Sequence, residues 1–281
     1  MTTIPQRLRS VLYMPGANER ALEKARTIPA DALILDLEDA VAPDAKAEAR
    51  TRVCAAASSG GYEGRVVTIR VNSIGSEWHE ADLIAAAQAG PDAIVVPKVN
   101  SAAEVLEVER ALVSAGAPAE TKIWAMLETP LAVLHAYEIA AASERLTVLV
   151  LGTNDLVKEF YAAIMPGRGP LQTALSMCLI GARAAGKQIL DGVYNDVKDL
   201  DGFTAECLQG KQLGFDGKTL IHPGQVEPCN QIWSPSAAEI EHSRRVIEAF
   251  EAAGSGVVTV DGRMIENLHV EIARRILALA D

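Results

Sequence analysis

The chain has 281 residues, of which 49% are hydrophobic and 22% are charged, an ordinary globular composition with ample material for a core. This length allows two domains or one large α/β domain. The formal net charge of −11 argues against a nucleic-acid or membrane-surface partner, so local arginines, lysines and backbone amides must hold any anionic ligand.

The four cysteines are scattered and form no CxxC pair: Cys54, Cys178, Cys207 and Cys229. This spacing argues against a structural zinc site and favours reduced thiols in a cytoplasmic protein. The first ten residues, MTTIPQRLRS, lack the apolar stretch of a signal peptide, and no apolar run approaches the roughly 18 residues of a membrane span. We therefore expect neither secretion nor a membrane span.

Short apolar, β-branched runs alternate along the chain with longer segments that have the helical spacing of apolar residues. Eight runs predict strands: residues 10–16, 32–39, 66–72, 93–99, 122–128, 146–152, 188–194 and 217–223. The intervening segments predict helices, among them residues 19–28, 80–90, 102–116 and 131–143. Several of these helices end at a glycine, which adopts the left-handed conformation of a helix C-terminus without strain.

Strands that each lead into a helix predict parallel pairing with right-handed crossovers. The runs are apolar almost throughout, so both faces of each strand should be buried. We therefore predict a (β/α)₈ TIM barrel over residues 1–225. An open, doubly wound sheet is the structural alternative, although no GxGxxG motif follows the first strand.

Residues 226–281 interrupt the alternation of strands and helices. They predict a C-terminal helical extension with a helix over 236–254, a short apolar stretch at 257–266 and a last helix. We expect this extension to pack on the barrel or on a neighbouring subunit.

Polar residues stand at or just past nearly every predicted strand end, where the active sites of barrels lie. In chain order they are Asp36 and Glu38, Arg70 and Asn72, Lys98, Glu128, Asn154 and Asp155, Asp191 and Asn195, and His222. Carboxylates at the end of a buried strand are unstable unless a cation, an arginine or water compensates them. We therefore expect the carboxylates in LILDLEDAV, residues 33–41, to line a site and to meet Arg70 or Lys98 there.

Glu128 and Asp155 are the predicted metal ligands, because they follow adjacent strands. Two carboxylates, completed by water and a substrate oxygen, suit Mg²⁺ better than zinc. The alternative is that each carboxylate caps the helix that follows it.

Three basic residues are candidates for substrate binding. Arg70 either pairs with the carboxylates of the preceding strand or grips a substrate carboxylate or thioester oxygen, and both roles are compatible. Lys98 either forms a Schiff base or, as we favour, a salt bridge. Arg20, in the PGANER stretch after the first strand, is placed to hold a phosphate at a helix N-terminus.

These segments resemble the citrate lyase β-subunit-like enzymes, a family that includes malyl-CoA, β-methylmalyl-CoA and citramalyl-CoA lyases and a malyl-CoA thioesterase. The matching stretches run in order from about residue 7 to the end: RSVLYMPGANERALEKA, DALILDLEDAVAPDAKAEAR, IRVN, AIVVPKV, LETP, LGTNDL, DGVYND and GKTLIHPGQV. The resemblance implies an oligomeric barrel, a trimer or hexamer, with Mg²⁺ on Glu128 and Asp155 and with Arg70 beside a CoA thioester and a 2-oxo acid. Asp36, Glu38 and Lys98 would then surround the site and orient Arg70 and the metal-bound water.

The resemblance also implies a late catalytic Asp followed by Pro, in some members contributed by a neighbouring subunit. This chain has GRMIENLH, with Glu266 at that position and no proline after it. The extra methylene moves the carboxylate by more than about an ångström, enough to alter catalysis. The alternative is that Glu266 caps the final helix.

Three functions fit the resemblance. The first is a Mg²⁺-dependent lyase that cleaves a C–C bond of a malyl-CoA-type thioester to a 2-oxo acid and an acyl-CoA. The second is a (3S)-malyl-CoA thioesterase. The third is a citrate lyase β-subunit that acts on a carrier-bound citryl thioester.

Overall fold

The computed structural model describes residues 6–62, 64–254 and 256–280 of the chain. The described chain divides into a larger unit, Leu8–Asn230, and a smaller unit made of residues 6–7 and the segment from Gln231 onward. Helix α10 (Val226–Trp233) runs across the boundary between the two units, and the predicted division of the chain after residue 225 stays a prediction.

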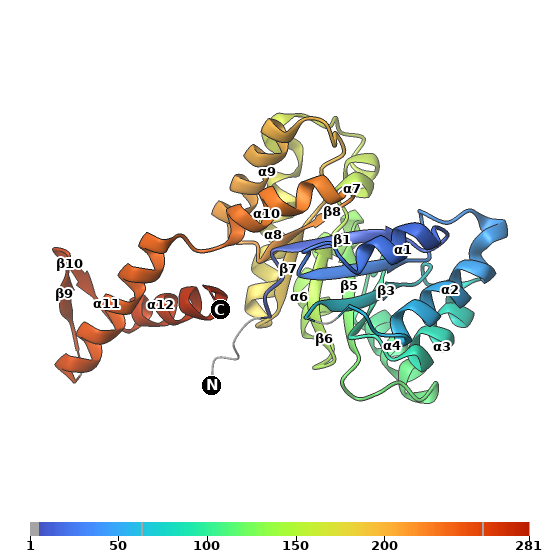
Figure 1. The fold of residues 1–281 in the computed structure, drawn as a ribbon, viewed down its shortest axis with the longest axis horizontal. Coiled ribbons are helices and arrows are strands. Elements are labelled where there is room, and N and C mark those ends of the chain that lie inside the picture. Colours follow the sequence, from blue (N-terminus) through green and yellow to red (C-terminus); the bar gives the residue numbers. More distant parts are fainter. Residues whose placement is uncertain (1–5, 63, 255, 281) are drawn as a thin grey trace. The chain divides into compact units, whose positions relative to one another are not determined.

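The larger unit is a closed barrel of eight parallel strands (Figure 1). The strands are β1 (Ser10–Pro15), β2 (Ala32–Asp36), β3 (Val66–Arg70), β4 (Ala93–Val96), β5 (Lys122–Leu127), β6 (Leu146–Leu151), β7 (Gln188–Asp191) and β8 (Gly217–Leu220). Pairing of β1 with β8, in which Val11 lies opposite Thr219, closes the ring. This closure confirms the predicted (β/α)₈ barrel, and the open, doubly wound alternative is wrong.

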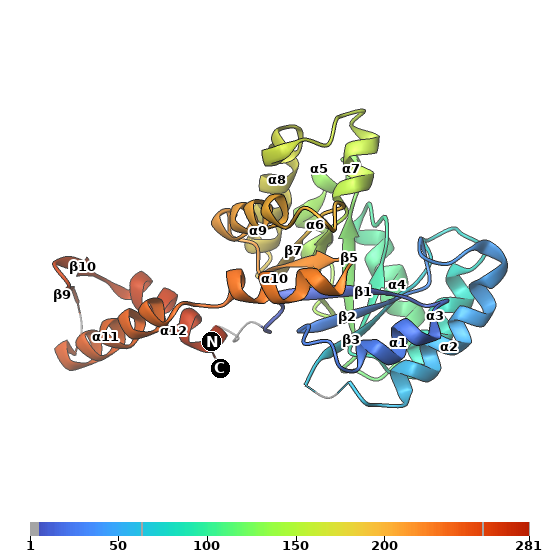
Figure 2. The same cartoon turned by 45° about the horizontal axis from the view of Figure 1, so that its top comes forward.

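Helices surround the strands, and α2, α3 and α4 lie side by side along one part of the ring (Figures 1 and 2). Their bounds are α1 (Glu19–Ala25), α2 (Lys46–Ser58), α3 (His79–Ala89), α4 (Ala102–Ser114), α5 (Pro130–Leu134), α6 (Ala136–Ala141), α7 (Thr153–Glu159), α8 (Gln172–Ala184) and α9 (Leu200–Leu213), with 3₁₀ turns η1 (Pro43–Ala45), η2 (Pro166–Leu171) and η3 (Pro223–Gln225). The single helix predicted over 131–143 is wrong, because the backbone leaves the helical region at His135, with φ −100° and ψ 13°, and divides it into α5 and α6.

Alternate strand residues fill the barrel interior, because side chains of a strand point to opposite faces in turn. The buried interior side chains include Val11, Ala32, Ile34, Ala93, Val95, Trp124, Met126, Val148, Val150 and Leu190. Asp36 pairs in register with Arg70, so the same alternation places both at the carboxyl end of the interior. The apolar pattern therefore fixes which way the polar residues at this end point.

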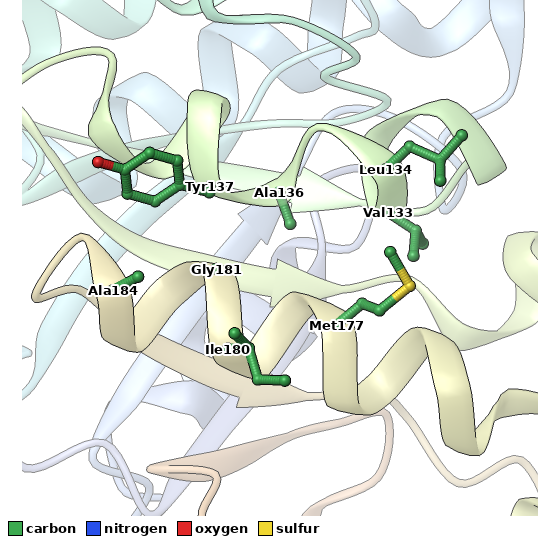
Figure 3. A pocket seen from close by; sticks show the side chains of 8 residues that line it. All are labelled: Val133, Leu134, Ala136, Tyr137, Met177, Ile180, Gly181 and Ala184. Carbon is green, nitrogen blue, oxygen red and sulfur yellow. The ribbon is translucent and has the colours of Figure 1, made fainter.

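An apolar groove lies on the outside of the barrel between α5–α6 and α8 (Figure 3). Leu134 and Tyr137 on one side and Ile180 on the other are more than half exposed. At the floor α6 and α8 approach closely, since a Cβ at Gly181 would lie 2.8 Å from the Tyr137 backbone nitrogen.

The smaller unit contains two helices, α11 (Ala237–Ala253) and α12 (Asn267–Ala280), and the antiparallel hairpin of β9 (Val258–Val260) and β10 (Arg263–Ile265). Val246, Val260, Ile265, Val270 and Ala273 form its small buried core. Across the ranges that the structure describes, no helix combines the length and the apolar character needed to cross a membrane.

Candidate active site

A buried ion pair joins the ends of β2 and β3. Arg70 donates from Nε to Asp36 Oδ1 at 2.6 Å and from Nη2 to Asp36 Oδ2 at 2.7 Å. The backbone N–H groups of Glu38 and Ala40 also donate to this carboxylate. Burial alone would raise the pKa of Asp36, but the guanidinium and these hydrogen bonds hold it below its usual value. The Asp36 carboxylate is therefore charged and fixes Arg70 in place.

The remaining side of Arg70 faces Glu38 and Tyr13. Its Nη1 lies 2.8 Å from Glu38 Oε2, an ion-pair distance at an angle that makes no hydrogen bond. The guanidinium carbon lies 4.8 Å from the centre of the Tyr13 ring. Burial by itself lowers the pKa of Arg70, but Asp36 and Glu38 raise it well above the ordinary value. Arg70 is thus a permanent, oriented positive charge.

Lys98 connects Glu38 to Glu128. Its Nζ donates to Glu38 Oε1 at 3.1 Å, which confirms the predicted salt bridge. Its backbone N–H donates to Glu128 Oε1 at 2.8 Å. Burial raises the pKa of Glu128 to about 7, and the nearby carboxylates of Glu38 and Asp155 add to the rise. Negative charge is therefore undercompensated at Glu128.

Glu128 and Asp155 do not cap the helices that follow them, so the capping alternatives are wrong. The Thr129 side chain caps α5 by accepting from Ala132 N, and α7 begins before Asp155, at Thr153. The end of β6 is shaped around Glu128, because a Cβ at Gly152 would lie 2.2 Å from Glu128 Oε2. The glycine of the LGTND segment is thus the sequence signal for the space that this carboxylate occupies.

A pocket of about 320 Å³ opens at this end of the barrel. It is lined by Tyr13, Asp36, Asp39, Ala40, Arg70, Met126, Glu128, Leu151, Gly152, Thr153, Asn154, Asp155, Val193 and Ile221. The predicted site residues Asp36, Arg70, Glu128 and Asp155 meet there, whereas Glu38 is buried and pairs with the pocket-lining Arg70. Tyr13 also lines the pocket and was not predicted from the sequence as a site residue. It follows Val11 by two positions on β1, so strand alternation points both side chains into the barrel, and this spacing was a signal for it.

Lys98 and Arg20 are not among the described residues that line this pocket, and Glu266 belongs to the smaller unit. Arg20 is exposed on α1, whose N-terminus is capped by the Asn18 side chain. Glu266 directly precedes α12 in the smaller unit, and its carbonyl accepts from His269 N and Val270 N. The roles assigned to Arg20 and Glu266 stay predictions.

Asp191, at the end of β7, is not among the described residues that line this pocket. Its carboxylate accepts from Arg168 Nη1 at 2.6 Å and from Lys218 Nζ at 3.0 Å, and Lys218 also donates to Glu206. Although burial raises the pKa of Asp191, Lys218 and Arg168 hold it below the usual value. This network lies between strands and outer helices, so Asp191 serves the fold.

The donor set around Glu128 and Asp155 fits a hard divalent cation. Both donors are carboxylates, neither is neutralised by an arginine as Asp36 is, and Glu128 is almost fully buried. Oxygen ligands of this kind suit Mg²⁺, with water and substrate completing the coordination.

A closed barrel with an acidic pocket at the carboxyl ends of its strands is the arrangement of TIM-barrel enzymes. The model of the HpcH/HpaI aldolase/citrate lyase family matches residues 9–223, and a model described as a C–C bond lyase of the TIM-barrel fold matches residues 172–281. The chain belongs to the HpcH/HpaI aldolase/citrate lyase family, as the resemblance indicated.

Relatives with described activities match almost the whole chain. A (3S)-malyl-CoA thioesterase of Cereibacter sphaeroides is 50% identical, with 97% of this chain and 94% of the relative covered. The citrate lyase subunit beta of Escherichia coli is 39% identical, with 97% and 93% covered. The crystal structure of protein CitE from Mycobacterium tuberculosis in complex with magnesium, acetoacetate and coenzyme A is 27% identical, with a TM-score of 0.78 over 96% of this chain and 97% of that one.

Proposed function

We propose that this chain is a Mg²⁺-dependent hydrolase of a malyl-CoA-type thioester, with (3S)-malyl-CoA as its substrate. The observation that carries the proposal is a small acidic pocket with one immobilised guanidinium, in a chain 50% identical to a (3S)-malyl-CoA thioesterase over 97% of its length. The pocket volume of about 320 Å³ lies at the small end of ligand sites and suits the acyl part of the thioester.

Glu128 and Asp155 would hold Mg²⁺. The crystal structure of the related CitE protein in complex with magnesium and coenzyme A supports magnesium as the ion, and the buried, undercompensated Glu128 carboxylate supports these ligands. When bound, the ion would supply Lewis-acid stabilisation of negative charge on substrate oxygens.

Arg70 stabilises the negative charge that develops on the thioester oxygen during attack by water. Asp36 holds two of its nitrogens, so the guanidinium needs no reorganisation when that charge appears. Glu38 forms ion pairs with both Arg70 and Lys98, and these pairs help to hold the guanidinium in place. These contacts support a role for the chain's own residues in orienting the acyl group.

Hydrolysis joins the oxygen of a water molecule to the acyl carbon and breaks the C–S bond, and the electrons of that bond leave with the sulfur of coenzyme A. One water proton passes to a carboxylate and the thiolate is finally protonated. The candidate carboxylates are Asp39, which lines the pocket and is 66% exposed, and Glu266, which the family resemblance implies. The variant, D39N or E266Q, that abolishes turnover while keeping magnesium affinity identifies the base.

The test follows free thiol and 2-oxo acid together in purified protein with Mg²⁺ and (3S)-malyl-CoA. Hydrolysis releases free thiol and no 2-oxo acid, and the E128A variant should abolish it. A hydrolase assignment is wrong if a 2-oxo acid and acetyl-CoA appear without free thiol.

A C–C lyase is the second candidate, favoured by the C–C bond lyase match over residues 172–281. It would cleave malyl-CoA, β-methylmalyl-CoA or citramalyl-CoA to a 2-oxo acid and an acyl-CoA. Turnover only of a carrier-bound citryl thioester would instead support a citrate lyase β-subunit, the function of the relative that is 39% identical.

We also propose that the chain forms a homo-oligomer, a trimer or a hexamer, in the cytoplasm. The free thiols of Cys54, Cys178, Cys207 and Cys229 support a reducing compartment.

A further inference from the structure

Lys98 has a backbone conformation that lysine disfavours. Its φ of 53° lies in the left-handed region, where the side chain of a residue other than glycine crowds its own backbone. Such strain persists only where the surroundings hold it, and it concentrates at functional sites. The result of this turn is that the Lys98 N–H points at Glu128 Oε1, 2.8 Å away, while Nζ reaches Glu38.

Asn100 is the residue that holds this turn. Its Nδ2 donates to the Lys98 carbonyl at 2.8 Å, and its Oδ1 accepts from Thr129 Oγ1. Thr129 directly follows Glu128, so one amide side chain connects the segment after β4 to the segment after β5.

The Asn100 backbone is also fixed on both sides. Its N–H donates to Glu104 Oε2 at 2.5 Å, and its carbonyl accepts from His135 Nδ1 at 2.9 Å. His135 lies at the break between α5 and α6, and Glu104 in the first turn of α4. Asn100 is therefore anchored by two helices, and its side chain has little freedom to leave Lys98 and Thr129.

We propose that Asn100 is a positioning residue for the catalytic pocket. It holds the strained turn at Lys98 so that the Lys98 N–H orients the Glu128 carboxylate toward Asp155 and the substrate. This inference rests on the proposed function for its consequence in catalysis, while the hydrogen-bond claim stands on the contacts alone. Partners of metal-binding carboxylates typically change metal affinity about 10- to 100-fold when they are removed.

Asn230 provides a matched control. Its Nδ2 donates to the Pro29 carbonyl at 2.8 Å and its Oδ1 accepts from Ser10 Oγ at 2.7 Å, the same two kinds of bond that Asn100 makes. Asn230 is not among the described residues that line the pocket. A change of Asn to Asp at either position keeps the acceptor oxygen, removes the donor and adds one negative charge.

The first experiment compares N100D with N230D by amide hydrogen exchange at residue 98 and by calorimetric titration with Mg²⁺ alone. We expect N100D to accelerate exchange of the Lys98 amide on the order of tenfold, as for loss of a supporting hydrogen bond, and to weaken magnesium binding at least about tenfold. N230D should change neither. Unchanged exchange at residue 98 in N100D, or equal changes in both variants, would overturn the proposal.

A double-mutant cycle separates the held turn from a general loss of packing. Glycine adopts a φ of 53° without strain, so in the K98G variant the turn no longer needs the Asn100 side chain to hold it. N100A should therefore reduce magnesium affinity less in the K98G background than in the wild type. Equal effects in both backgrounds would show that Asn100 does not act through the turn.

The two readouts also separate this proposal from the proposed function. If wild-type protein binds no Mg²⁺, the metal-dependent function fails, and the exchange rate at residue 98 still decides the role of Asn100. If magnesium binds and malyl-CoA is not hydrolysed, the effect of N100D on magnesium affinity decides it.

Discussion

At the scale of single residues, Arg70 is the group on which transition-state stabilisation depends. The R70K variant keeps the positive charge, but the ammonium of a flexible lysine cannot make the two parallel hydrogen bonds that the Arg70 guanidinium makes to Asp36. We expect kcat to fall about 100-fold or more, as for loss of an oriented charge donor, with little change in fold. Steady-state kinetics on the thioester, with R110K on the exposed face of α4 as the control, measure this loss. Equal kinetics of R70K and R110K would contradict the role of Arg70.

Glu128 predicts a pH dependence of stability in metal-free protein. Burial and neighbouring carboxylates raise its pKa in the folded state to about 7 from 4.5, so the folded state binds this proton more tightly than the unfolded state. Its contribution to the free energy of unfolding therefore falls as pH rises through the window between these values. A shift of this size corresponds to about 3 kcal/mol, an upper bound.

The isosteric E128Q variant has no charge to bury. In EDTA at pH 8 it should be more stable than the wild type by up to about 3 kcal/mol, with the difference shrinking as pH falls toward 5. Urea unfolding at the two pH values measures this difference, and E138Q, at an exposed position of α6, is the control. A wild type as stable as E128Q at pH 8 would show that Glu128 is charged without cost.

At the scale of secondary-structure elements, the junction of β6 and α7 determines where Glu128 lies. Gly152 has φ −97° and ψ 75°, which alanine can adopt, so the obstacle to G152A is the contact of the new Cβ with Glu128. The carboxylate must move, and we expect G152A to lose most of the magnesium-induced rise in melting temperature. G169A is a matched control, because a Cβ there meets nothing within 4 Å. The explanation fails if both variants respond to magnesium like the wild type.

The same scale shows where periodicity misled. Apolar spacing over 131–143 predicted one helix, but a hydrogen bond from His135 to the Asn100 carbonyl coincides with the break between α5 and α6. The spacing of apolar residues indicates which face of a helix is buried. It contains no information about a hydrogen bond to a residue 35 positions away.

At the scale of the whole molecule, we predict an assembly of three or six chains. Light scattering should give three or six times the 29.8 kDa of one chain. A single species of one-chain mass across the micromolar range would contradict this prediction. The measurement needs no substrate, so it is independent of the assigned reaction.

Local patterns in the sequence were enough to predict the barrel and the candidates for its site. Strand and helix periods are local properties, and parallel strands gather their carboxyl ends on one face, so Asp36, Arg70, Glu128 and Asp155 were recognisable as polar interruptions of apolar runs. Tertiary structure alone decided how these groups share charge: that Asp36 clamps Arg70, that Glu38 lies behind the pocket, and that Asn100 holds a strained Lys98 against Glu128. Distances, angles and burial set these energies, and they exist only once the barrel has closed.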